Sequence, residues 1–222
     1  MKNKVPERIR HASGRWWQAC RGAVLALMVA WSAGGAHATD ISQLRVERSD
    51  DGVYLSAQAR FELPPVVEDA LLRGIPLFFV VEADIYRDRW YWTDPRVASA
   101  ARTLRLAYQP LTRRWRLNIA AGVISNSAGL RATLNQNYES LPEALAAIQR
   151  IARWRIAEPA DVNPNATHRL EFSFRLDLSQ LPRPFQIGVA GQRDWNISAQ
   201  VKERLKLEPL SPPTNLGTEV SQ

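Results

Sequence analysis

The feature that most constrains the fold is an alternation of apolar and polar residues with a period of two. Successive side chains of a β-strand point to opposite faces, so this period predicts strands with one buried and one solvated face. The alternating segments are 44–47, 53–61, 104–108, 115–119, 168–178 and 197–207. The nearly continuous apolar run 76–85 predicts a more central strand. We expect a mainly β (α+β) fold, either an antiparallel β-sandwich or a curled sheet.

Turns and two short inserted helices are predicted between these strands. Asp50-Asp51-Gly52 indicates a hairpin turn. Pro64 to Gly74 indicates a helix with prolines at its start and glycine after its end. Ser140 and Glu143 form a capping box for a second helix. Its apolar stripe is expected to comprise Leu141, Leu145, Ile148 and Ala152.

Two strand details bear on candidate sites. A tight loop at Pro110 and Leu111 would place Arg105 opposite Arg116 on the outer face. On the inner face the same register puts Leu106 opposite Trp115 and Leu104 opposite Leu117. Glu203 interrupts the alternation of the last strand, which indicates a bulge or an edge position.

The first 38 residues have the pattern of a secretory signal peptide. Six basic residues and one acidic residue precede an apolar run over 23–31, and Ala36-His37-Ala38 supplies a small-x-small cleavage site. The run is well short of the roughly 20 residues of a spanning helix. We expect periplasmic export with cleavage after Ala38, or an uncleaved anchor as the only membrane contact. Residues 39–207 would form one exported domain, and 208–222 a Pro-rich disordered tail.

Removal of the signal changes the charge on which a functional argument must rest. The whole chain has 29 Lys+Arg and 22 Asp+Glu, a net charge of +7. Residues 39–222 keep a net charge of only +2, and the single cysteine leaves with the signal. We therefore expect no nucleic-acid partner. One remaining histidine, His168, and no cysteine argue against a transition-metal site, so no metal and no cofactor are expected.

Catalytic candidates are sparse. Glu82 and Asp84 are spaced to share one strand face, and paired carboxylates are the groups that glycoside hydrolysis needs. Arg87 and Arg89 are close enough in sequence to neutralise them as ion partners. His168 is in phase with apolar neighbours, which favours a structural role.

Basic and aromatic residues form the more distinctive candidates for binding. Arg105, Arg114 and Arg116 would gather on one outer face, where they need carboxylates from a neighbouring strand or a bound anion. Arg87, Arg89, Trp90 and Trp92 form the second group. It is either a core-facing tryptophan pair with a solvated arginine face, or a binding surface, because Trp and Arg dominate interface hot spots.

Several short runs resemble a known family. They are 62–64 (ELP), 70–77 (ALLRGIPL), 89–92 (RWYW), 106–108 (LAY), 111–115 (LTRRW) and 181–184 (LPRP). Together they resemble an uncharacterised proteobacterial family of exported proteins, catalogued as a domain of unknown function, over roughly Ile41 to Leu207. The resemblance implies an envelope location and a gene often near a nitrogen-regulation-type sensor histidine kinase. It supplies no catalytic residues.

The function expected from these observations is a periplasmic binding or interaction module of unknown specificity. Its partner would be another envelope or membrane protein, such as the exported portion of a sensor. The alternatives are a cell-wall glycan hydrolase that uses Glu82 and Asp84, and a carrier of a lipid or small anion.

Overall fold

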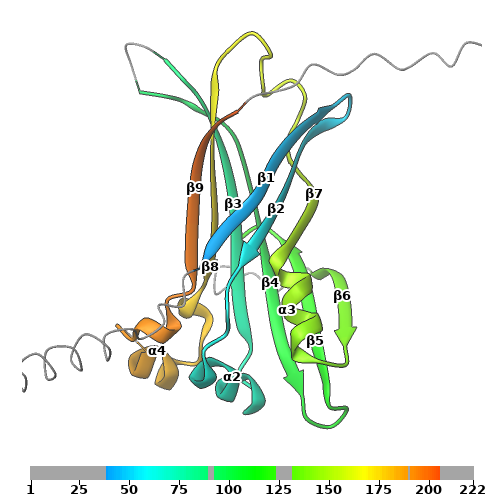
Figure 1. The fold of residues 1–222 in the computed structure, drawn as a ribbon, viewed down its shortest axis with the longest axis vertical. Helices are drawn as coiled ribbons and strands as arrows, with labels where there is room; N and C mark the ends of the chain where they lie inside the picture. Colours follow the sequence, from blue (N-terminus) through cyan, green and yellow to red (C-terminus); the bar gives the residue numbers. More distant parts are fainter. Residues whose placement is uncertain (1–38, 90–92, 124–131, 190, 206–222) are drawn as a thin grey trace, which may run out of the picture. The chain divides into compact units, whose positions relative to one another are not determined.

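The computed structural model describes residues 39–89, 93–123, 132–189 and 191–205. The predicted signal peptide and the predicted tail lie outside these residues. Within them the chain forms two antiparallel sheets, one with the strand order β1-β2-β7 and one with the order β6-β5-β4-β3-β8-β9 (Figure 1). The strands are β1 (Asp40–Ser49), β2 (Gly52–Arg60), β3 (Leu77–Arg87), β4 (Arg96–Gln109), β5 (Arg114–Ala121), β6 (Ala132–Tyr138), β7 (Arg150–Ala157), β8 (His168–Leu176) and β9 (Ser198–Leu205). The predicted α+β class with antiparallel sheets is confirmed.

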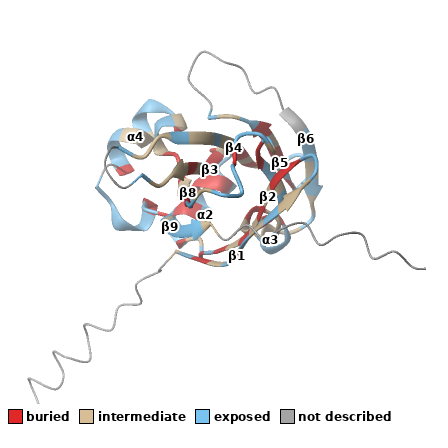
Figure 2. Ribbon diagram, turned by 90° about the horizontal axis from the view of Figure 1, so that it is seen from above, coloured by how far each residue is buried: buried red, intermediate tan, exposed pale blue. Residues whose placement is uncertain are grey.

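The core lies between the two sheets, where the inward faces of the strands meet (Figure 2). The β8 strand alternates strictly between buried and half-buried residues, as its sequence predicts. The rings of Phe61, Phe79 and Phe174 pack with centroids 5.3 to 5.6 Å apart. Buried aromatic side chains contribute large apolar areas, so this trio is a major source of stability. The central position predicted for β3 is confirmed, since β4 and β8 flank it.

The first hairpin and the first helix follow their sequence signals. Ser49 pairs with Gly52, which leaves Asp50 and Asp51 in the turn. Helix α2 (Pro65–Leu72) begins with proline and is followed by Gly74 at φ 84°. The N–H of Gly74 donates to Leu71 and that of Ile75 donates to Ala70, at 2.8 and 3.1 Å. These two bonds form a Schellman motif, which explains the glycine at a left-handed position.

The second helix is confirmed at its start but ends earlier than its stripe suggests. Helix α3 (Leu141–Gln149) is capped by the Ser140 hydroxyl, which accepts from the Glu143 N–H at 3.4 Å. Ala152 does not continue the helix but lies exposed in β7. The β7 strand was not predicted. Its pairing with β2 contains irregularities, and Arg153 has a φ of 40°, which breaks the period-two pattern in its sequence.

The β4–β5 hairpin has a longer loop than predicted. Gln109 pairs with Arg114, so the loop contains four residues and the register shifts by two. Leu106 lies opposite Leu117, and Arg105 lies opposite Asn118 rather than Arg116. A shift of two keeps every side chain on its face, so the apolar pattern matches both registers equally well. Pro110 and the positive φ of Arg113 (51°) suit the longer loop.

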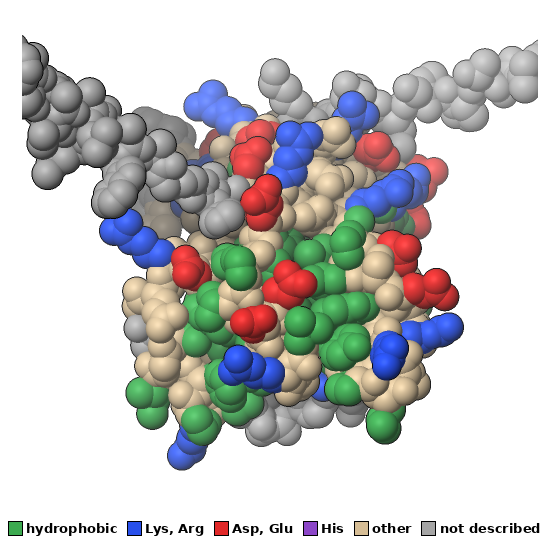
Figure 3. Space-filling model, turned by 60° about the horizontal axis from the view of Figure 1, so that its bottom comes forward, with side chains coloured by type: hydrophobic (Ala, Val, Ile, Leu, Met, Phe, Trp, Pro, Cys, Tyr) green, Lys and Arg blue, Asp and Glu red, His purple; other side chains and the backbone are tan. Residues whose placement is uncertain are grey.

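One α-helix in the described residues was not predicted. It is α4 (Arg183–Val189), which lies between the short 3₁₀ segments η1 (Leu178–Gln180) and η2 (Arg193–Trp195). None of the helices in the described part of the chain is long and apolar enough to cross a membrane. Figure 3 shows the end of the domain toward α2 and α4, where hydrophobic side chains mix with acidic and basic ones. Exposed apolar residues near this end are Val66, Leu72, Leu111 and Ile187.

Candidate functional site

The predicted arginine group lies on the outward face of the six-stranded sheet. We use the name Arg–Asn cluster for Arg105, Arg116, Asn118, Asn135 and Asn137, which come from β4, β5 and β6. Arg105 is opposite Asn118 on β5, and Asn118 is opposite Asn135 on β6. Arg116 is opposite Asn137. Directly opposed residues of paired strands share a face, so the five side chains belong to one surface.

Hydrogen bonds link the Arg–Asn cluster through amide groups. Arg105 Nη1 donates to Asn118 Oδ1 at 3.5 Å, and Asn118 Nδ2 in turn donates to Asn135 Oδ1. Arg116 Nε donates to Asn137 Oδ1, also at 3.5 Å. When the side-chain amide of Gln109 is flipped to satisfy its neighbours, its oxygen accepts from both terminal guanidinium nitrogens of Arg116 at 3.1 and 3.2 Å. Neutral amides satisfy N–H donors without neutralising the guanidinium charge.

Arg105 occupies an unfavourable place for a cation. Burial lowers its pKa, and the nearby positive charge of Arg116 lowers it further. Its guanidinium carbon lies 5.9 Å from the ring centroid of Phe78, which offers a cation–π contact. Within the described residues neither Arg105 nor Arg116 forms an ion pair with a carboxylate. Arg105 and Arg116 therefore lie near each other, as expected, although the corrected register does not place them directly opposite each other.

Arg114 differs from these two arginines. Its Nη2 lies 3.7 Å from a carboxylate oxygen of Glu139, and both side chains are more than half exposed. An exposed pair of this kind contributes between zero and about 1 kcal/mol. Arg114 thus pairs with a neighbouring carboxylate, whereas asparagines occupy the equivalent positions beside Arg105 and Arg116.

The second predicted group is only partly described. Trp90 and Trp92 lie outside the described residues. Arg87 ends β3 half-buried, and Arg89 is exposed, with its backbone N–H donating to Asp94 Oδ1 at 2.8 Å. The structure places neither arginine beside the Arg–Asn cluster in the strand register. Arg87 pairs instead with His168 on β8.

His168 is buried, as its apolar phase predicts, with 1% of its surface exposed. Neither ring nitrogen has a hydrogen-bond partner of good geometry within the described part of the chain. Burial lowers its pKa most, the nearby backbone of Ala166 opposes that shift, and Arg87 lowers the pKa further. The described residues hold no cluster of His, Cys, Asp and Glu suited to a metal ion.

Glu82 and Asp84 share the outward face of β3, as their spacing predicts. Glu82 lies 3.6 Å from Arg175 Nε, and Asp84 lies 3.4 Å from Arg96 Nη1. Arginines do neutralise these carboxylates, as expected. The partners are Arg175 and Arg96, however, and not Arg87 and Arg89. Neither carboxylate is among the residues that line the pocket between β1 and β9.

Two charged residues with structural roles were not among the sequence candidates. Arg169 approaches Asp88, Asp94 and Glu171 at 3.9, 3.2 and 3.5 Å, and thereby joins β8 to the segment after β3. Arg102 is paired with Val81, which is buried in the core, and its guanidinium lies 4.9 Å from the ring of Trp154 on β7. Burial lowers its pKa to about 10. Its signal in the sequence is a charge in phase with Leu104 and Leu106.

These elements define the class of the protein: an α+β fold of two antiparallel sheets, with polar clusters on its outward face. Residues 36–204 match the family model of the Domain of unknown function (DUF4390), and the chain belongs to that family. The predicted membership in a catalogued domain of unknown function is confirmed. No curated protein and no solved structure shows significant similarity to the chain.

Proposed function

We propose that this protein is an exported binding module that recognises an anionic group of an envelope partner through Arg105 and Arg116. The observation that carries the proposal is the Arg–Asn cluster, in which two neighbouring guanidinium groups have amide partners and no carboxylate among the described residues. A carboxylate or phosphate that binds there would relieve their mutual repulsion and form charge-assisted hydrogen bonds. Arg116 is exposed and therefore accessible to such a group.

The alternatives receive less support. A glycan hydrolase would need Glu82 and Asp84 free to reach substrate, whereas each lies against an arginine. A carrier of small anions between the sheets would need a positively charged cavity. Two carboxylates, those of Glu47 and Glu203, offset the two arginines that line the pocket between β1 and β9, so this pocket is not a positively charged cavity.

Chemical cross-linking in the envelope tests the proposal. The full chain, expressed with its own N-terminus, is compared with an Arg105→Gln/Arg116→Gln variant and an Arg73→Gln/Arg60→Gln control. Arg60 and Arg73 are exposed and lie in β2 and after α2, so the control removes equal charge elsewhere. We expect a discrete cross-linked complex that the cluster variant loses and the control keeps, and whose yield falls as salt is raised. Equal yields from the two variants would refute the proposed surface.

A further inference from the structure

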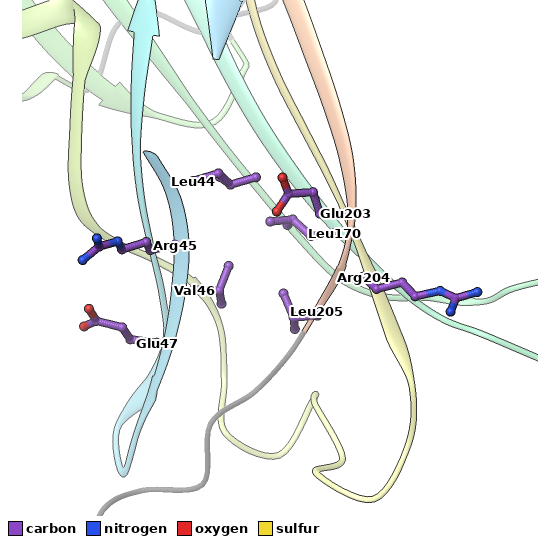
Figure 4. Close-up of a pocket in the computed structure, with 8 residues that line it drawn as sticks. All are labelled: Leu44, Arg45, Val46, Glu47, Leu170, Glu203, Arg204 and Leu205. Atoms are coloured by element: carbon purple, nitrogen blue, oxygen red, sulfur yellow. The ribbon is translucent and has the colours of Figure 1, made fainter. Parts of the chain in front are cut away.

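The two sheets leave a groove between their edge strands β1 and β9. It has a volume of about 560 Å³, and its lining residues come from β1, β8 and β9 (Figure 4): Leu44, Arg45, Val46, Glu47, Leu170, Glu203, Arg204 and Leu205. β1 pairs only with β2, and β9 only with β8, within the described sheets. The groove is therefore the open side of the sandwich. Its volume lies in the range of small-molecule sites.

The side chains that face the groove are mainly aliphatic. Figure 4 shows Leu44 and Val46 directed from β1 toward Leu170 and Leu205 on the other sheet. A bulge between Ser42 and Arg45, with Gln43 at φ 53°, interrupts the β1–β2 register beside Leu44. Bulges commonly redirect a side chain, and here the interruption accompanies a leucine that faces the groove.

Glu203 is the charged residue that faces the groove. It pairs with Leu170 without any shift in the β8–β9 register, so it lies on the inward face and not in a bulge. The sequence exception in the last strand is thus a real inward-facing carboxylate on an edge strand. Figure 4 shows it directed into the groove, whereas Arg45, Glu47 and Arg204 point away.

No cation in the described residues neutralises Glu203. Its neighbour Lys202 lies on the outward face and pairs with Glu171 at 3.1 Å. Arg204 is opposite Arg169 on the outward face as well. The groove therefore combines an aliphatic wall with one exposed and unpaired negative charge.

We propose that this groove binds a cationic amphiphile, a molecule with an aliphatic chain and an ammonium group. The chain would cover Leu44, Val46 and Leu205, and the ammonium would donate hydrogen bonds to the Glu203 carboxylate. An amphiphile with an anionic head would meet charge repulsion at the same place. The groove is separate from the Arg–Asn cluster and prefers the opposite charge, so the two proposals can fail independently.

A peptide that extends the sheet along β9 is the competing occupant. An inward-facing charge on an edge strand disfavours such strand addition, because the incoming strand must bury or pair that charge. Glu203 thus favours a small amphiphile over a peptide strand.

Calorimetric titration of the full chain with dodecylammonium and dodecanoate, both below their micelle-forming concentrations, tests this proposal. The probes share one chain length and differ in the charge of the head. We expect dodecylammonium to bind and dodecanoate to bind at least about tenfold more weakly. Glu203→Gln should reduce the affinity for dodecylammonium about tenfold, equivalent to about 1.4 kcal/mol, and reduce the discrimination between the probes.

Glu68→Gln is the matched control, because it removes one exposed carboxylate from α2, which contributes no residue to the lining of the groove. This variant should bind both probes as the unmodified chain does. Circular dichroism confirms that both variants are folded. Equal binding of the two probes, equal effects of the two variants, or no binding of dodecylammonium would overturn the proposal. Binding of an alternating leucine–lysine peptide without binding of dodecylammonium would overturn it in favour of strand addition.

Discussion

Arg102 and Glu203 are both charged residues on inward faces of the six-stranded sheet, yet their surroundings are opposite. Arg102 on β4 is covered by Trp154 of β7, and burial lowers its pKa. Glu203 on β9 is exposed in the groove beside β1. On the first side the smaller sheet lies over the charge, and on the second side the two sheets leave an opening. An interruption of the apolar pattern therefore marks a structural contact in one place and an available surface in the other.

Substitutions on these two sides should have different effects on the free energy of unfolding. A buried cation needs compensation, and an aromatic face offers about 2 kcal/mol or more when the cation is desolvated. An exposed carboxylate retains most of its hydration and costs little. Substitutions beside Arg102 should therefore affect stability, whereas substitutions of Glu203 should chiefly affect what the groove accepts.

The largest expected effect is at Trp154. Trp154→Ala removes a half-buried ring and leaves the Arg102 guanidinium without its cover, so the free energy of unfolding should fall by about 3 kcal/mol. Urea unfolding measures the loss. Arg102→Met keeps the volume but removes the charge, and it should change stability by no more than about 1 kcal/mol.

Leu111→Ala, at a fully exposed loop position, is the neutral control for that series. A loss above about 2 kcal/mol in Arg102→Met would contradict the comparison, because the cation itself would then stabilise the closed side.

Measuring the free energy of unfolding as a function of pH extends the comparison to His168, which is buried and pairs with Leu205 in the strand register. Because burial lowers its pKa below the usual 6.5, the folded state binds this proton less readily than the unfolded state. The stability of the fold should therefore decrease as the pH falls below about 6.5, by at most about 1.4 kcal/mol per pH unit from this group.

His168→Phe removes this titratable group and places an apolar side chain on the same strand face as the apolar neighbours. Its stability should be less dependent on pH between 7 and 5 in chemical unfolding experiments. An unchanged pH profile in the variant would assign the acid sensitivity to carboxylates instead.

The sequence predicted the strands with a clear apolar period, including β9 despite its exception at Glu203, and it missed β6 and β7. β8 and β3 were predicted because one face is apolar throughout, and α2 because proline and glycine mark its ends. β7 was missed because bulges break its period, and α4 because it has only seven residues. The β4–β5 register was wrong by two residues, since a shift of two preserves each face.

The candidate site was predictable in its residues but not in its partners. The sequence placed Arg105 and Arg116 on one face, although only the register shows that asparagines rather than carboxylates adjoin them. The groove could not be predicted, because it arises from edges of different sheets that are more than 120 residues apart in the chain. Its one sequence signal was Glu203, and an exception in one strand does not indicate what lies across from it.

The smallest expected effect is at Glu203, and its direction is opposite to that at Trp154. Glu203→Leu restores the apolar alternation of β9 and adds aliphatic surface to the groove, so the free energy of unfolding should rise by less than about 1 kcal/mol. The same change removes the inward charge that protects an edge strand, so self-association through β9 should increase. Thermal unfolding and sedimentation velocity measure the two effects, with Glu47→Leu as the control on the outward side of β1. A loss of stability in Glu203→Leu would mean that the carboxylate contributes to the fold, which would contradict the interpretation of Glu203 as part of an available surface.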